Sequence, residues 1–254
     1  HPNHRVNCRT RFMLASVSAH PIPFRPLSAT KSESFPFPPA FVKIHARLMK
    51  DNLPSILPAR PGQALLLVLL LFAVGLLAIL PGYEGYFFGD EHFYTDSALQ
   101  MRATGRYLTP TYADGSLRFN KPILPYWMIV AGFRVAGVSV LGSRLPSLLA
   151  GLVILLLTRR LTRRLFRSEA AGWVALLIMA SNIGLMTASM RATPDVFLCL
   201  FTLAALTGYA GLLLDAPRPA DPWLAYLGTG LAILSKGLLG ALLPLFALAV
   251  AFSR

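Results

Sequence analysis

The stretch QALLLVLLLFAVGLLAIL, residues Gln63–Leu80, decides the fold class of this chain. It carries no charge and is long enough to cross a bilayer as an α-helix. Pro81 and Gly82 end the predicted helix, and the polar passage Gly89-Asp90-Glu91-His92-Phe93-Tyr94 follows. Two adjacent carboxylates therefore stand where the chain leaves the hydrocarbon.

The composition is that of a membrane protein. The chain is 55% hydrophobic and 14% charged, with a mean hydropathy of +0.57, which is unlike a soluble domain. Its net charge of +13 does not predict nucleic-acid binding, because the basic residues lie in the N-terminal stretch and in short loops. Cytoplasmic loops of membrane proteins are rich in Lys and Arg. The two cysteines, Cys8 and Cys199, predict neither a disulfide nor a metal site.

Both ends of the chain differ from its middle. Residues 1–48 begin with His1, are rich in Pro, Ser and Phe, and contain one acid, Glu33. They have no sustained periodicity, which predicts a disordered or non-native N-terminal extension. Residues 49–254 are interpreted as the N-terminal part of a transmembrane domain. The sequence stops at Arg254 just after the apolar stretch 241–252, so we expect a truncated domain.

Further apolar segments predict an all-α polytopic membrane protein with about six spans. The segments that follow Gln63–Leu80 are Pro146–Thr158, Ala170–Ser189, Val196–Leu214, Trp223–Leu234 and Leu238–Phe252. The last two are short, so a tilted span, a broken span and one bent hairpin are all open. Trp127, Trp173, Trp223 and Tyr226 are interpreted as anchors at the membrane interface.

The segment Pro122–Val138 is apolar but is interrupted by prolines, glycines and Arg134. If it crosses the membrane, the arginine-rich run 159–167 lies on the same side as Asp90 and Glu91. The basic flank of the first span then lies on the opposite side, which violates the positive-inside rule.

If Pro122–Val138 lies in the interface instead, with Tyr126 and Trp127 at headgroup level, the arginine run becomes cytoplasmic. Loop 190–195 and the turn Ser235-Lys236-Gly237 then join the acidic passage on the outer side. We therefore favour an outer loop over residues 81–142 that carries interfacial helices.

Four polar clusters result on the outer side. They are Gly89-Asp90-Glu91-His92-Phe93-Tyr94, Arg118-Phe119-Asn120-Lys121-Pro122, Arg191-Ala192-Thr193-Pro194-Asp195 and Ser235-Lys236-Gly237. Carboxylates can take a proton from an acceptor hydroxyl, and Lys and Arg can neutralise a phosphate. A membrane enzyme that moves a sugar from a lipid phosphate needs both functions beside the bilayer.

This ordered set resembles the group of aminoarabinose transferases and protein mannosyltransferases, which are GT-C glycosyltransferases. The resemblance covers about residues 60–254. It implies a GT-C-like helical bundle, a polyprenyl-phosphate sugar donor, a lipid or protein acceptor and inversion of the anomeric centre. It also implies a bacterial inner-membrane location with the active site on the periplasmic side.

The resemblance assigns roles to individual residues. Asp90 or Glu91 resembles the base that orients and deprotonates the acceptor, and Asp195 resembles a second functional aspartate. Tyr94, Lys121 and Lys236 resemble residues beside the donor phosphate, and Arg191 is expected to join them. Asn120 and Phe93 depart from the family, whose aminoarabinose members usually have Glu and a basic residue there.

Each site residue also has a plain structural interpretation. Acids at the start of a helix stabilise it, and this suffices to explain Asp90, Glu91 and Asp195. Lys121 is interpreted as a lysine that snorkels to the membrane surface, and Arg191 as an ion-pair partner of Asp195. His92 is interpreted as structural. No metal site and no cofactor are predicted, since nothing in the sequence supports a divalent metal. The competing functional classes are a membrane transporter and a non-catalytic membrane fragment.

Overall fold

The computed structural model describes residues 61–79, 89–214 and 217–252. Contacts divide the chain into His1–Phe37 and Pro38–Arg254, and every described residue belongs to the second unit. The predicted N-terminal extension 1–48, with Cys8, lies outside the described residues. So do Lys50, Arg60 and the start of the predicted outer loop, residues 81–88.

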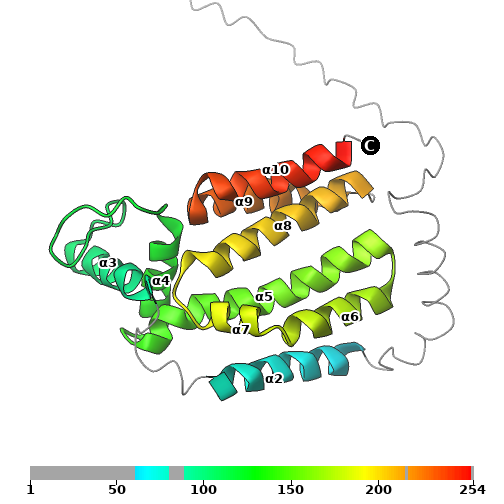
Figure 1. Cartoon of the computed structure of the whole chain (residues 1–254), viewed down its shortest axis with the longest axis horizontal. Helices are drawn as coiled ribbons and strands as arrows, with labels where there is room; N and C mark the ends of the chain where they lie inside the picture. Colours follow the sequence, from blue (N-terminus) through cyan, green and yellow to red (C-terminus); the bar gives the residue numbers. More distant parts are fainter. Residues whose placement is uncertain (1–60, 80–88, 215–216, 253–254) are drawn as a thin grey trace, which may run out of the picture. The chain divides into compact units, whose positions relative to one another are not determined.

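The described residues form helices joined by loops, which confirms the all-α fold class (Figure 1). The helices are α2 (Pro61–Ile79), α3 (Glu91–Thr104), α4 (Leu124–Ala136), α5 (Val140–Phe166), α6 (Glu169–Ala180), α7 (Ile183–Ser189), α8 (Pro194–Leu214), α9 (Ala220–Lys236) and α10 (Leu238–Phe252). One isolated antiparallel bridge joins Thr111 to Leu117 in the loop between α3 and α4.

Each segment that the sequence predicted as a span is mostly helical where the structure describes it. Within the described residues, α5 and α8 are long and apolar enough to cross a bilayer, and α6 with α7 forms a third candidate. The number of crossings stays a prediction. The last two predicted segments are two helices, α9 and α10, separated at Gly237, whose φ is +69°.

The helix α5 is much longer than the predicted span Pro146–Thr158. It begins at Val140 because the Ser139 side chain accepts a hydrogen bond from the Gly142 amide at 3.0 Å, which caps the helix. Pro146 lies inside it and cannot bond the carbonyl four residues earlier. That carbonyl, of Gly142, faces Gly132 of α4 so closely that a Cβ on Gly132 would lie 2.1 Å from its oxygen.

The predicted span Ala170–Ser189 is not one continuous helix. It consists of α6 and α7, which meet at a bend of 63°. The Asn182 side chain accepts a hydrogen bond from the Leu185 amide at 2.9 Å and so caps a new helix. Since a capped start competes with continuation of α6, the chain turns at Ser181 and Asn182.

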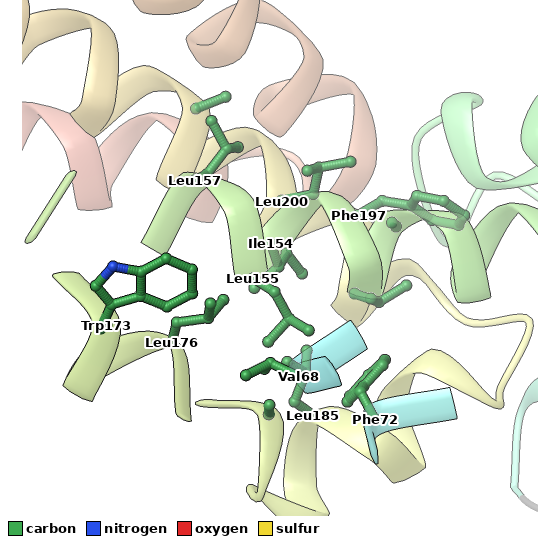
Figure 2. Close-up of a cluster of buried hydrophobic side chains, with 14 residues drawn as sticks. Val68, Phe72, Ile154, Leu155, Leu157, Trp173, Leu176, Leu185, Phe197 and Leu200 are labelled. Atoms are coloured by element: carbon green, nitrogen blue, oxygen red, sulfur yellow. The ribbon is translucent and has the colours of Figure 1, made fainter. Parts of the chain in front are cut away.

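The main apolar core joins α2, α5, α6, α7 and α8 (Figure 2). Its members include Phe72, Ile154, Leu155, Leu176 and Phe197, each at most 1% exposed. Trp173 belongs to this core and is only 8% exposed, with the Arg159 guanidinium 4.5 Å from its ring centroid. The interpretation of Trp173 as an interface anchor is therefore wrong, because its ring packs against α5.

A second core lies between α3, α4 and the loop before α8. Tyr126 is fully buried in it, so this side chain packs inside the protein, and its level relative to the headgroups stays a prediction. Trp127 is more exposed and donates its indole hydrogen to the Tyr107 carbonyl at 2.7 Å. With 13 residues, α4 is about 20 Å long, which is shorter than a hydrocarbon core of about 30 Å. This length agrees with an interfacial helix.

A buried ion pair joins α5 to α9 at the end of the long helices that carries the arginine run. Arg164 donates two hydrogen bonds of 2.9 Å to Asp221, and its other terminal nitrogen donates to the Thr207 carbonyl of α8 at 2.8 Å. Gly211 of α8 makes room for the pair, because a Cβ there would lie 2.3 Å from Arg164 Nη1 and 2.4 Å from Asp221 Oδ2.

The substitution Gly211→Ala is therefore expected to lower the free energy of unfolding by about 1–3 kcal/mol, as overpacking of a filled site does. Equilibrium unfolding in detergent measures this change. Gly230→Ala is the matched control, because no atom lies within 4 Å of a Cβ on Gly230 of α9. Alanine favours a helix over glycine, so this control should be neutral or stabilising. Equal loss in both variants would contradict the close contact.

Candidate functional site

A cavity of about 260 Å³ lies where α3 and α8 begin and α9 ends. We call it the outer-end cavity. Figure 1 shows α3 and α4 beside these helix ends. The cavity is lined by Gly89, Asp90, Tyr94, Lys121, Arg191, Thr193, Pro194, Asp195 and Lys236. Six of the seven predicted site residues therefore come together from four separate stretches of chain.

Asp90 presents a carboxylate to this cavity. Its main-chain oxygen accepts hydrogen bonds from the amides of Phe93 at 3.1 Å and Tyr94 at 3.4 Å, which starts α3. Its side chain makes no capping hydrogen bond and has no hydrogen-bond or ion-pair partner among the described residues. The carboxylate is therefore available to a ligand. A role as a helix cap would not by itself explain this availability.

Glu91, the next residue, faces away from the cavity. It is 0% exposed, and its two oxygens accept hydrogen bonds from Arg144 Nε at 2.8 Å and Nη2 at 2.9 Å. Its Oε1 also accepts from the Ala192 amide at 2.9 Å. Glu91 thus ties the start of α3 to α5 and to the loop before α8, and so holds two walls of the cavity in place.

Asp195 and Lys236 form an ion pair at the cavity wall. The Lys236 ammonium, at the end of α9, donates a hydrogen bond to Asp195 Oδ1 in the first turn of α8. Both side chains remain accessible to solvent, with Lys236 30% and Asp195 57% exposed. An incoming anion can therefore reach the ammonium.

Lys121 and Tyr94 complete the polar lining with Arg191. The ammonium of Lys121 has no hydrogen-bond partner among the described residues. Burial raises the pKa of Tyr94, although the nearby Arg118 guanidinium acts in the opposite direction. The Tyr94 phenol thus stays protonated and can donate a hydrogen bond. Three cations and two carboxylates around one cavity suit a phosphate group and a reacting hydroxyl.

Two arginines behind the cavity were missed as site residues. Arg144 lies inside a helix that the sequence placed further along the chain, and no local pattern pairs it with Glu91. Arg118 was recognised only as part of a polar cluster. It is 4% exposed and donates from Nε to the Tyr126 hydroxyl at 3.1 Å.

The described residues contain no group of three His, Cys, Asp or Glu side chains that could hold a metal ion. The His92 ring lies against that of Phe93, tilted by 39° with ring centroids 3.8 Å apart, and His92 does not line the cavity. Cys199 is exposed on α8.

Residues 120–254 match the family described as dolichyl-phosphate-mannose-protein mannosyltransferase. The chain is 34% identical to an uncharacterised protein of Aquifex aeolicus over 64% of this chain and 32% of that protein. It is 32% identical to the undecaprenyl phosphate-alpha-4-amino-4-deoxy-L-arabinose arabinosyl transferase of Pseudomonas aeruginosa, over 69% of this chain and 33% of that one.

A solved structure has the same fold. The crystal structure of ArnT from Cupriavidus metallidurans bound to undecaprenyl phosphate matches 75% of this chain and 35% of its own, with a TM-score of 0.63 and 25% identity. The chain spans about a third of the length of the curated relatives that it matches. These likenesses confirm the GT-C membrane fold, and the match over more than half of the chain shows that it belongs to the dolichyl-phosphate-mannose-protein mannosyltransferase family of membrane glycosyltransferases.

Proposed function

We propose that the outer-end cavity is the donor phosphate site and acceptor-activating centre of a glycosyltransferase. The enzyme would transfer a sugar from a polyprenyl-phosphate donor to a lipid or protein acceptor at the outer face of the bacterial inner membrane. The observation that carries this proposal is that the free carboxylate of Asp90 and the free ammonium of Lys121 line the same cavity. The names of the Pseudomonas relatives and the lipid in the ArnT structure support the same class of donor.

The mechanism follows from these charges. Asp90 accepts the proton of the acceptor hydroxyl as its oxygen bonds to the anomeric carbon. The bond between that carbon and the phosphate oxygen breaks, and the polyprenyl phosphate leaves with the electron pair. Lys121, Lys236 and Arg191 stabilise the charge that develops on the phosphate. Attack on the face opposite the leaving group inverts the anomeric centre.

The charges at the two ends of α5 support an outer-face site. Arg144 binds Glu91 beside the cavity, and Arg164 belongs to the arginine run at the other end. Twenty helical residues span about 30 Å, which equals the thickness of a hydrocarbon core. If the arginine run is cytoplasmic, as the positive-inside rule predicts, the cavity opens on the periplasmic side.

The position of the cavity also argues against a transporter. Transporters bind their substrates near the middle of the bilayer, between broken helices. The ionisable residues here lie at the start of α3, the start of α8 and the end of α9. We therefore favour chemistry at the membrane surface over passage through it.

Lys121→Gln is expected to weaken binding of undecaprenyl phosphate about tenfold, because it removes a charge-assisted contact worth about 1.5–3 kcal/mol at most. Binding to the full chain in lipid nanodiscs measures the change, and transfer from a radiolabelled undecaprenyl-phosphate sugar in native membranes tests the activity. Arg106→Gln is the control, since Arg106 is an exposed loop residue that does not line the cavity. Labelled solute that crosses vesicles without any sugar transfer would instead support the transporter.

A further inference from the structure

Arg118 is a buried cation whose charge no carboxylate balances among the described residues. It is 4% exposed, and its Nε donates a hydrogen bond to the Tyr126 hydroxyl. The hydroxyls of Tyr94 and Tyr112 also lie close enough to interact with the guanidinium. The other two buried arginines of the described residues, Arg144 and Arg164, each bind a carboxylate. A buried guanidinium without a counter-ion is costly unless other groups stabilise it.

Aromatic rings supply that stabilisation. The Arg118 guanidinium carbon lies 4.9 Å from the ring centroid of Phe93, 5.1 Å from that of Tyr94 and 4.9 Å from that of Tyr112. Cation–π contacts of this kind become stronger as the cation loses water. The rings hold the guanidinium in one place without cancelling its charge, as a carboxylate would.

The uncancelled charge lies directly behind the cavity wall. Tyr94 contacts Arg118 with its ring and also lines the outer-end cavity. Lys121, three residues after Arg118, lines the same cavity. The positive potential of Arg118, which lies against the Tyr94 ring, therefore adds to that of the lining cations Lys121, Arg191 and Lys236. Water screens a buried charge only weakly, so this contribution persists inside the cavity.

We propose that Arg118 is a positioning residue of the outer-end cavity, which holds the Tyr94 phenol in the wall and increases the affinity of the cavity for a lipid phosphate. This inference rests on the proposed function, because it assigns a phosphate to the cavity. Arg118 acts through its charge and through Tyr94, and it does not touch the ligand.

The test compares two lipids that share the same polyprenyl chain and differ in the phosphate group. Undecaprenyl phosphate and uncharged undecaprenol are titrated against the full chain in nanodiscs, for the wild type and for Arg118→Gln. We expect Arg118→Gln to weaken binding of the phosphate about tenfold, equivalent to about 1.4 kcal/mol, and to leave binding of undecaprenol unchanged. Arg118→Lys, which keeps the charge, should recover most of the loss.

The matched control is Arg134→Gln. Arg134 also lies over a tyrosine ring, with its guanidinium carbon 5.5 Å from the Tyr107 centroid, but it is exposed and does not line the cavity. Arg134→Gln should change neither the affinity for undecaprenyl phosphate nor the affinity for undecaprenol.

The outcomes separate the two proposals. If the wild type prefers the phosphate and Arg118→Gln keeps that preference, the role of Arg118 is overturned while the donor site stands. If both Arg118 variants lose both lipids equally, Arg118 is structural only. If the wild type binds the two lipids alike, the donor site itself fails, and the inference fails with it.

Discussion

Asp90→Asn is expected to lower the rate of sugar transfer at least about a hundredfold, the effect of losing a general base, with little change in undecaprenyl phosphate binding. The Asp90 carboxylate lines the cavity without a described partner. Asparagine has nearly the same shape, so the cavity should persist, but an amide cannot accept the acceptor proton. Initial rates with a labelled polyprenyl-phosphate sugar, together with lipid binding to the same preparation, measure both quantities.

Asp96→Asn is the control for this prediction. Asp96 lies in the same helix, α3, and does not line the cavity, so its substitution should leave the transfer rate within about twofold of the wild type, as neutral surface changes do. A full rate in Asp90→Asn would remove the carboxylate mechanism. A parallel loss of lipid binding would show that Asp90 shapes the cavity instead of acting on the acceptor.

Arg144→Met is expected to cost about 3–5 kcal/mol of stability, because it leaves the buried Glu91 carboxylate without its counter-ion. The pair is nearly inaccessible to solvent, with 4% and 0% of the two side chains exposed. It also joins α3, α5 and the loop before α8, so loss of the pair should loosen the cavity walls. Equilibrium unfolding in detergent measures the stability, and undecaprenyl phosphate binding should weaken in parallel.

The double variant Glu91→Leu/Arg144→Met separates charge from packing. Replacing both members of a buried pair by apolar residues is often nearly neutral, so the double variant should recover most of the stability. Arg163→Met is the control, because Arg163 pairs with Glu169 at the same 2.8 Å distance while Arg163 is 35% and Glu169 52% exposed. Such pairs contribute about 0–1 kcal/mol. A loss in Arg144→Met no larger than that of the control would contradict the structural role of the buried pair.

The two adjacent carboxylates should therefore behave differently. Asp90→Asn should affect chemistry alone, whereas Glu91→Gln should lower stability and lipid binding as well as transfer. The sequence offered Asp90 and Glu91 as interchangeable candidates for the base. Neighbouring residues on a helix project about 100° apart, so one of them can face a cavity while the other faces the core.

Much of the architecture follows from local patterns. The apolar run Gln63–Leu80, the later apolar segments and the arginine run predicted a helical membrane protein, and α10 has the predicted bounds. One of the two errors has a local cause and the other a tertiary one. The bend between α6 and α7 depends on the cap at Asn182, and burial of Trp173 depends on its contact with α5.

The sequence by itself determined the helices and the four polar clusters, because apolar length and the positions of charged residues are properties of the chain alone. Only the tertiary structure decided which polar groups remain free inside the outer-end cavity. Glu91 is paired by an arginine 53 residues away and Lys236 by an aspartate 41 residues away, and no local pattern encodes such distant contacts. Asp90 and Lys121 line the cavity where α3 packs against α4 and α8 packs against α9, and neither side chain has a hydrogen-bond or ion-pair partner among the described residues.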